Sequence, residues 1–232
     1  MNPHQAEKNW YKSPLFLRVI AVGRPYFVKT PWFLKMLWPS YVWSIDTSER
    51  IIYLSFDDGP HPVATPFVLD ELKQYDAKAT FFCIGENVIT YPEIYRRVLN
   101  EGHAVGNHTQ HHLNGWKCGD EVYLNDVAEA TKHIDSALFR PPYGRIRRFQ
   151  ARNLRHAIKS HVPKIIMWSV LSGDFDQSIS EMKCLENVIG FAKPGSIVVF
   201  HDSEKAFPRL RHALPLCLRY FSEKGYRFEG LS

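Results

Sequence analysis

The stretch IIYLSFDDGP, residues 51–60, decides the fold of this chain. Residues 51–56 form a nearly continuous apolar run, which is typical of a strand buried on both faces of a parallel sheet. Asp57 and Asp58 close the run, and a Gly-Pro dipeptide breaks it. Two adjacent carboxylates resist joint ionisation unless they share a cation or a proton. The stretch therefore fits either a plain turn or a site where one carboxylate binds a metal and the other acts as a base.

From Arg50 onward, short apolar runs alternate with helical patterns. Such alternation predicts parallel strands joined by crossover helices. The expected strands cover residues 51–56, 79–84, 103–106, 164–169, 196–200 and 226–229, and the expected helices cover residues 65–75, 86–101, 121–138, 149–159, 180–192 and 208–223. Fewer than eight strand–helix units are visible. We therefore expect an α/β fold, a distorted and incomplete (β/α) barrel of parallel strands, as a single domain over residues 50–232.

The composition is that of an ordinary globular protein. The chain has 232 residues, 45% of them hydrophobic, and 29 basic against 24 acidic residues give a net charge of +5. No run of Lys or Arg is dense enough to form a nucleic-acid stripe, so no nucleic-acid partner is expected. Aromatic residues make up 14% of the chain, which suits either core packing or a stacking surface for sugars. The composition leaves the oligomeric state open.

Residues 1–49 form an N-terminal extension rich in aromatic and basic residues. Residues 15–23 have the length of a signal-peptide core, but Arg18 lies in the middle of it. Further basic residues interrupt the apolar pattern, so no membrane-spanning helix is expected. The aromatic and basic stretch 31–39 suits either a membrane surface, contacted through residues 14–45, or packing on the barrel bottom. The expected location is cytoplasmic or membrane-associated, with an extracytoplasmic site left open.

Polar residues directly follow the apolar runs, where the active sites of parallel barrels lie. They are Asp57, Asp58, His108, His112, Arg140, Tyr143, Asp174, His201 and Asp202. The i, i+4 spacing of His108 and His112 places both on one face of a helix or tight turn, which suits a divalent metal. Two histidine nitrogens and one carboxylate oxygen make the shell typical of catalytic zinc. His201 is placed to act as an acid on the far side, whereas His61 and His111 are expected to take no part.

Four stretches, in order, closely resemble the motifs of the polysaccharide deacetylase family (carbohydrate esterase family 4, the NodB homology domain). They are residues 55–60, His108-Thr109-x-x-His112, residues 140–144 and residues 199–201. The resemblance covers about residues 50–230 and implies an N-acetylated glycan as substrate. It implies that Asp57 is the general base. It also implies that Asp58, His108 and His112 bind one divalent metal ion, usually zinc, with cobalt or other divalent ions also accepted.

The resemblance implies roles for four further residues. Arg140 would hold Asp57 ionised and oriented through charge-assisted hydrogen bonds. The backbone N–H of Tyr143 would bind the oxyanion beside the metal. His201 would protonate the departing amine, and Asp174 would pair with His201 and raise its pKa.

The chain departs from the family pattern at four positions. The fourth family motif commonly reads Asp-x-x-Asp-Trp, whereas this chain has Leu171 for the first Asp and Phe175 for Trp. Val199 replaces a Leu that lines the acetyl-methyl pocket, and Ser55 replaces Thr. These departures bear on the substrate more than on the reaction.

The expected function is that of a metal-dependent hydrolase that removes N-acetyl groups from N-acetylglucosamine-type residues of a polysaccharide and releases acetate. Two alternatives stay open. One is deacylation of another small amide on the same scaffold, motivated by the altered fourth motif. The other is a non-catalytic glycan-binding or membrane-surface protein, motivated by the aromatic N-terminus.

Overall fold

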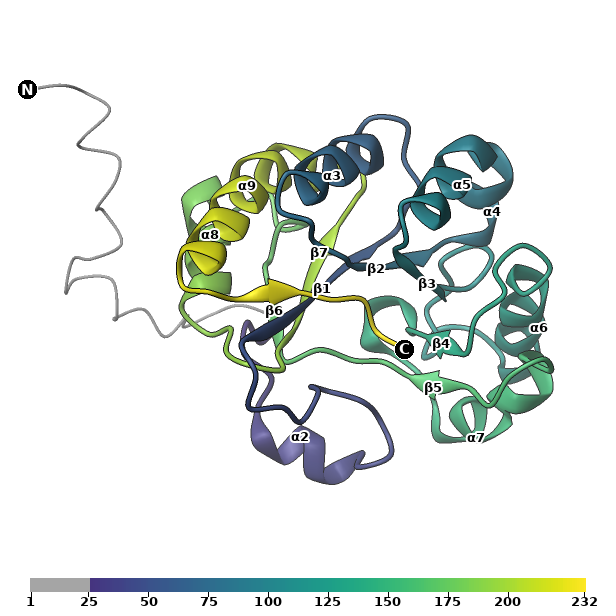
Figure 1. Cartoon of the computed structure of the whole chain (residues 1–232). Coiled ribbons are helices and arrows are strands. Elements are labelled where there is room, and N and C mark those ends of the chain that lie inside the picture. The colour runs from purple at the N-terminus through teal and green to yellow at the C-terminus, as the bar shows by residue number, and fades with distance from the viewer. Residues whose placement is uncertain (1–25) are drawn as a thin grey trace, which may run out of the picture.

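The computed structural model describes residues 26–232 and shows one curled sheet surrounded by helices (Figure 1). Its strands follow the order β5-β4-β3-β2-β1-β7-β6, and β8 pairs with β1. The strands are β1 (Ile51–Asp57), β2 (Thr80–Cys83), β3 (Ala104–Asn107), β4 (Leu138–Phe139), β5 (Lys164–Ile165), β6 (Val170–Leu171), β7 (Ile197–His201) and β8 (Arg227–Phe228). All their pairings are parallel. The expected distorted, incomplete (β/α) barrel is confirmed.

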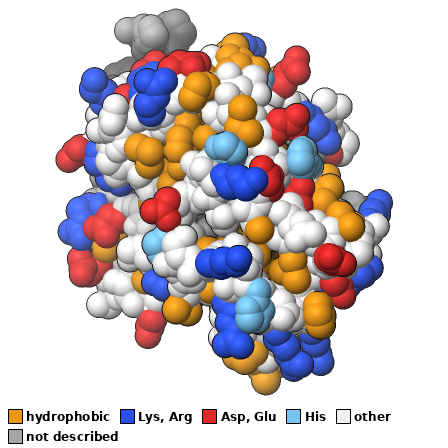
Figure 2. Space-filling view, turned by 90° about the vertical axis from the view of Figure 1, so that its right-hand side faces the viewer, with side chains coloured by type: hydrophobic (Ala, Val, Ile, Leu, Met, Phe, Trp, Pro, Cys, Tyr) orange, Lys and Arg blue, Asp and Glu red, His pale blue; other side chains and the backbone are white. Residues whose placement is uncertain are grey.

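Helices cover the outer side of the curled sheet, except for the first one, which belongs to the N-terminal segment and lies apart from the others (Figure 1). They are α2 (Trp32–Leu37), α3 (Ala64–Lys73), α4 (Gly85–Thr90), α5 (Pro92–Asn100), α6 (Asp120–Ala130), the short 3-10 helix η3 (Pro142–Gly144), α7 (Arg148–Ala157), α8 (Glu181–Ile189) and α9 (Phe207–Glu223). Over the side that carries α4 to α7, basic and acidic side chains are interspersed, without a continuous stripe of one sign (Figure 2).

Strand β1 is the centre of the core. All its residues are buried, and it pairs with β2 on one side and β7 on the other. The Phe56 ring packs against Phe81 at 5.1 Å and against Phe200 at 6.1 Å between centroids. Each such ring stabilises the fold by about 1.5–3 kcal/mol through its burial. The apolar run 51–56 thus fixes β1 in the middle of the sheet, and the two carboxylates follow at its carboxyl end.

Two of the predicted helices are wrong in extent. The helix expected over residues 86–101 is divided into α4 and α5, because Pro92 has no N–H for the helical ladder and begins a new helix. The helix expected over residues 121–138 ends at Ala130. Leu138 and Phe139 instead form β4, which brings the next residue, Arg140, to a strand end.

The strand expected over residues 164–169 is also wrong in extent. Its first two residues form β5, which pairs with β4, whereas β6 begins after it and pairs with β7. These two strands are the opposite ends of the sheet order, so the chain crosses the open side of the barrel between them. A continuous apolar pattern cannot reveal where such a crossing falls.

The N-terminal segment, residues 26–49, lies along this open side. The N–H of Val42 donates to the carbonyl of Ile165 at 2.9 Å, and the N–H of Leu171 donates to the carbonyl of Val28 at 2.8 Å. The segment thereby occupies backbone groups next to both end strands, which would otherwise offer unpaired edges.

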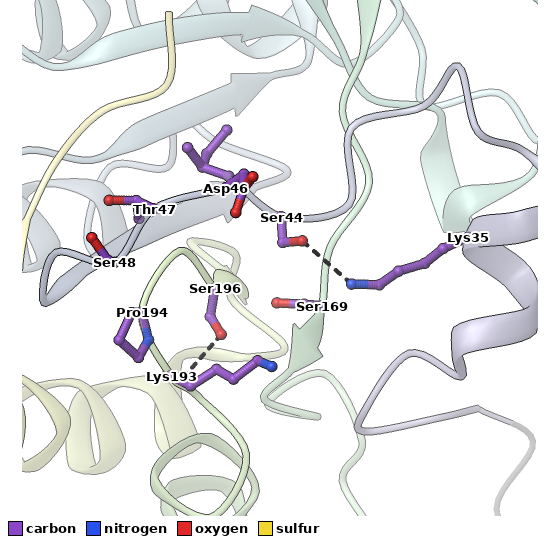
Figure 3. A pocket seen from close by; sticks show the side chains of 10 residues that line it. Lys35, Ser44, Asp46, Thr47, Ser48, Ser169, Lys193, Pro194 and Ser196 are labelled. Atoms are coloured by element: carbon purple, nitrogen blue, oxygen red, sulfur yellow. Dashed lines mark hydrogen bonds between the residues drawn. The ribbon is translucent and has the colours of Figure 1, made fainter.

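At the amino ends of β1 and β7, the same segment borders a polar pocket of about 550 Å³ (Figure 3). The Nζ of Lys35 donates to Ser44 Oγ at 3.3 Å on one side, and Lys193 lies on the other (Figure 3). The lining contains none of the expected site residues. The pocket lies at the amino ends of the strands, whereas the expected site residues follow the carboxyl ends. The two therefore lie at opposite edges of the sheet.

Among residues 26–232, no helix has the length and apolar character needed to cross a membrane. Helix α2 exposes Trp32, Met36 and Leu37. Contact with a membrane surface through residues 14–45 stays a prediction. The signal-like stretch 15–23 lies outside the described residues.

Candidate active site

Strand register brings the polar residues of the sequence together at one edge of the sheet. Asp57 is the last residue of β1 and lies opposite His201 of β7. On the other side of β1, the strands β2 and β3 end beside it, and His108 directly follows β3. Carboxyl ends of neighbouring parallel strands meet at the same edge, so Asp57 and Asp58 lie between His201 on one side and the pair His108 and His112 on the other.

Asp58, His108 and His112 form a cluster that could hold a metal ion. One ligand atom from each lies within 4.8 Å of the others. Oδ1 of Asp58 is 3.2 Å from Nε2 of His112 and 3.6 Å from Nε2 of His108. This oxygen is buried and accepts no hydrogen bond in the described part of the chain. Burial alone would raise the pKa of Asp58. The neighbouring His112, His201 and His108 outweigh burial and bring this pKa well below its usual value, so the carboxyl is ionised.

His108 is oriented as a metal-binding histidine would be. Its Nδ1 lies 2.7 Å from the carbonyl oxygen of Arg140, so Nδ1–H donates there and Nε2 is left with its lone pair toward Asp58. Burial lowers the pKa of His108 to about 4 despite the nearby carboxylates. The ring is therefore neutral, as a ligand must be.

The segment that carries both histidines is a tight turn, the second of the two expected geometries. Thr109 and His112 have positive φ angles of 66° and 56°. Asp126 of α6 holds this turn, because its Oδ2 accepts the N–H groups of Gln110 at 2.9 Å and His111 at 3.1 Å. In the sequence, Asp126 is only one acidic residue within a predicted helix, and its burial becomes visible in the structure.

Arg140 is fully buried and binds Asp57 directly. Its Nη1 donates to Asp57 Oδ1 at 2.6 Å and to Ser55 Oγ at 2.8 Å. Nε and Nη2 donate to the carbonyls of Ile166 and Met167, and the guanidinium lies 3.9 Å from the Phe82 ring centroid. Burial lowers the pKa of Arg140, while Asp57 raises it in part. Ser55, which replaces the Thr of the family pattern, still supplies a hydroxyl that accepts a hydrogen bond from Arg140.

His201 and Asp174 form a buried ion pair on the opposite side of Asp57. Nδ1 of His201 is 2.7 Å from Asp174 Oδ1, and the backbone N–H of His201 donates to Oδ2 at 2.6 Å. Burial alone would lower the pKa of His201, but the charge and hydrogen bond of Asp174 raise it to about 10. The ring is therefore protonated at neutral pH, and its Nε2–H remains to be donated.

The backbone is strained around this site. Among residues 26–232, five non-glycine residues have positive φ, and four of them are Asp58, Thr109, His112 and Tyr143. Left-handed conformations cost free energy for residues with a Cβ and concentrate at functional sites. Tyr143, with φ 61°, lies in η3, and its ring is 4.7 Å from the His112 ring.

Two departures from the family pattern take defined places. Phe175 packs 5.2 Å from the His201 ring and 5.1 Å from the ring of Tyr26. Tyr26 is held in turn by a 2.7 Å hydrogen bond from its hydroxyl to Asp176. Leu171 contributes to an apolar groove beside Tyr143. An N-terminal residue thus supports the smaller ring that stands where the family has Trp.

Asp202 joins the end of β7 to the end of β1 and to the start of α3. It is buried, accepts the hydroxyl hydrogen of Thr65 at 2.5 Å, and donates its backbone N–H to the carbonyl of Asp57 at 3.0 Å. Burial raises its pKa to about 8. Of the two expected bystanders, His61 accepts N–H groups at the start of α3, and His111 pairs with Asp126.

Comparison with known proteins agrees with the motif pattern. The model of the polysaccharide deacetylase family matches residues 44–161. A peptidoglycan-N-acetylglucosamine deacetylase of Bacillus cereus is 36% identical over 82% of this chain and 90% of its own length. A chitooligosaccharide deacetylase of Rhizobium leguminosarum bv. trifolii is 35% identical over 67% of this chain and 73% of its own.

A solved structure agrees with the fold. The crystal structure of the peptidoglycan N-acetylglucosamine deacetylase Bc1960, in complex with an N-hydroxybenzamide compound, has a TM-score of 0.77 and 33% sequence identity to this chain. The match covers 87% of this chain and 95% of that one.

Proposed function

The chain belongs to the polysaccharide deacetylase family, and on that premise we propose that it is a metal-dependent hydrolase of N-acetylated glycans. It removes N-acetyl groups from N-acetylglucosamine-type residues and releases acetate. The observation that carries the proposal is the position of Asp57 between a candidate metal cluster and a protonated histidine. The names of the relatives support the substrate class.

Asp58, His108 and His112 would hold the metal, and their atoms fit that role. The orphaned Oδ1 of Asp58 and the two Nε2 atoms converge, and the donor set of one carboxylate and two histidines suits a divalent ion, zinc first. When bound, such an ion supplies Lewis-acid chemistry, lowering the pKa of water and polarising a carbonyl.

Asp57 acts as the general base. The hydrogen bond from Arg140 fixes Oδ1 at 2.6 Å, which orients Oδ2 to accept a proton from the attacking water. Because Arg140 is itself held by two carbonyls and buried, the carboxylate has little freedom to turn away. The water then attacks the acetyl carbonyl, and the backbone N–H of Tyr143 stabilises the resulting oxyanion.

His201 acts as the general acid. It is protonated before the reaction, since Asp174 holds its pKa near 10. Its Nδ1 is occupied by Asp174, so the proton available to the departing amine is on Nε2. When the C–N bond breaks, transfer of this proton leaves a neutral amine on the sugar and acetic acid in the site, which ionises to acetate.

The proposal is tested by acetate release from chitooligosaccharide and from peptidoglycan, with the protein loaded with zinc. We expect activity that a chelator abolishes and zinc restores. Asp57→Asn keeps the shape of the side chain but cannot accept the proton, so it should retain metal and lose about 10²–10⁴-fold in kcat. Full activity in Asp57→Asn, or activity that survives the chelator, would contradict the mechanism.

A further inference from the structure

Helix α2 presents an apolar face to solvent. Because an α-helix turns once in about 3.6 residues, the exposed positions adjoin on one side of α2. They are Trp32, Phe33, Met36 and Leu37. Leu34 lies on the other side of the helix and packs against the core cluster that contains Trp43. Single exposed apolar residues are ordinary, whereas adjoining ones form a patch of the kind that marks protein or membrane contacts.

The polar pocket at the amino ends of β1 and β7 begins beside this face. Lys35 is the one residue of α2 in its lining, and its side chain points into the pocket toward Ser44 (Figure 3). Lys193 lies on the opposite side, with its side chain directed toward Lys35 (Figure 3). The volume of about 550 Å³ falls within the range of about 300–1,000 Å³ for ligand sites. Most of the remaining lining carries hydroxyl groups: Ser44, Thr47, Ser48, Ser169 and Ser196.

Positive charge exceeds negative charge around this pocket. Burial, followed by the charges of Lys193 and Lys29, lowers the pKa of Lys35. Within residues 26–232, none of these three lysines forms an ion pair with a carboxylate. The lining contains one carboxylate, that of Asp46. Like charges held together repel one another, so a bound anion would lower the free energy of this arrangement.

Two hydroxyl groups of the pocket have hydrogens left to donate. Ser44 Oγ accepts a hydrogen bond from Lys35 Nζ at 3.3 Å, and Ser196 Oγ accepts one from the backbone N–H of Lys193 at 3.0 Å. In the described part of the chain, neither hydroxyl donates its own hydrogen. Phosphate oxygens accept hydrogen bonds from ammonium and hydroxyl groups alike. The pocket therefore has the chemistry of a phosphate site.

We propose that α2 and this pocket together dock the protein on a lipid bilayer with anionic phosphate headgroups. The apolar face of α2 enters the boundary between headgroups and acyl chains, where Trp side chains are favoured. The pocket receives a lipid phosphate between Lys35 and Lys193. Because the pocket lies at the amino ends of the strands, docking leaves Asp57, at the carboxyl end of β1, on the opposite edge of the sheet. The site edge then faces away from the lipid.

The test measures how much of the full chain sediments with lipid vesicles at low salt. We expect binding to vesicles that contain phosphatidylglycerol and much weaker binding to uncharged vesicles of phosphatidylcholine alone. Lys35→Gln and Lys193→Gln should each lower the partition coefficient for the charged vesicles about fivefold, the effect of one basic residue near an anionic surface. Arg96→Gln is the matched control, because Arg96 is exposed, forms no ion pair among the described residues and lies on α5, away from α2 (Figure 1).

A second pair of variants tests the apolar face. Trp32→Ser removes a ring that is 71% exposed and should lower the same partition coefficient about tenfold, because less apolar surface leaves water on docking. Ile89→Ser is the control, since it removes a side chain that is 53% exposed on α4. This control should bind the charged vesicles as the wild type does.

Equal sedimentation with both kinds of vesicle would overturn the inference, and so would control variants that lose as much binding as the variants of α2 and the pocket. Binding of free glycerol phosphate without binding of vesicles would assign the pocket to a small phosphate compound instead. A dimer that Trp32→Ser dissociates, again without binding of vesicles, would assign the apolar face to a second copy of the chain. Either result refutes docking on lipid. The assay needs no turnover, so its outcome is independent of the proposed function.

Discussion

The two sides of Asp57 hold histidines in opposite electrostatic surroundings. On one side, burial lowers the pKa of His108 to about 4, and its Nδ1 faces a neutral carbonyl. On the other side, His201 is also largely buried, but Asp174 raises its pKa to about 10. The hydrogen-bond partner, more than the depth of burial, decides the charge. A neutral ring can bind a metal, whereas a protonated ring can donate a proton.

The largest effect should come from the neutral side. His108→Ala removes one of three candidate ligands, so metal affinity should fall by more than about 100-fold, since losses in the outer shell alone cost 10–100-fold. We expect about one zinc per wild-type chain, almost none in the variant, and loss of turnover. Elemental analysis of desalted protein measures this.

His111→Ala is the matched control for this loss. His111 belongs to the same turn, but its side chain is 57% exposed and pairs with Asp126. The variant should keep its zinc. Equal zinc content in His108→Ala and the wild type would show that the cluster does not hold the metal.

A smaller effect should come from the charged side. His201→Ala removes the proposed acid, so kcat should fall by about 10²–10⁴-fold while the zinc content stays unchanged. Acetate release and elemental analysis on the same samples separate the two sides. His161→Ala, which removes another histidine with an Asp partner, should alter neither quantity. Loss of zinc from His201→Ala would contradict the division between the two sides.

The sequence reveals the ends of strands better than the connections between them. The run 51–56 is apolar except for Ser55, which predicts a buried strand, and the end of such a strand meets the ends of its parallel neighbours. Arg140 was predicted at the site, although β4, the strand before it, was not predicted. Leu138, its first residue, was assigned to the helix expected over residues 121–138. Two-residue strands such as β4 and β6 carry no periodicity, and only pairing within the sheet defines them.

Support from distant residues is the part of the site that the sequence hides. Asp126 holds the histidine turn, and Tyr26 packs on the ring beside His201. Both contacts join segments far apart in the chain, and neither residue belongs to a motif. The polar residues at the strand ends could be predicted because parallel strands share an edge, a constraint that does not extend to a mid-helix carboxylate or an N-terminal ring.

The smallest of these effects should appear in the pH dependence of Asp174→Asn. Asn keeps a similar shape but removes the largest charge that raises the pKa of His201, so that pKa should fall from about 10 toward 6.5, with only the charges of Asp58 and Asp57 left to oppose burial. At pH 8, kcat should fall by up to about 30-fold, the factor for a histidine at 1.5 pH units above a pKa of 6.5. At pH 6 the loss should be much smaller. The alkaline limb of kcat therefore moves to lower pH.

The same shift fixes the sign of the effect on stability. In the wild type, the pKa of His201 is raised from 6.5 to about 10, so its stabilising contribution is fully present below pH 6.5 and is lost as the pH rises toward 10. Urea unfolding of Asp174→Asn should show a much weaker pH dependence in this range, because only Asp58 and Asp57 still raise the pKa of His201. Asp135→Asn, which changes the exposed pair with His161, should move neither profile. An unchanged alkaline limb of kcat in Asp174→Asn would contradict this prediction. It would mean that Asp174 only positions His201, and that Asp57 and Asp58 keep this histidine protonated.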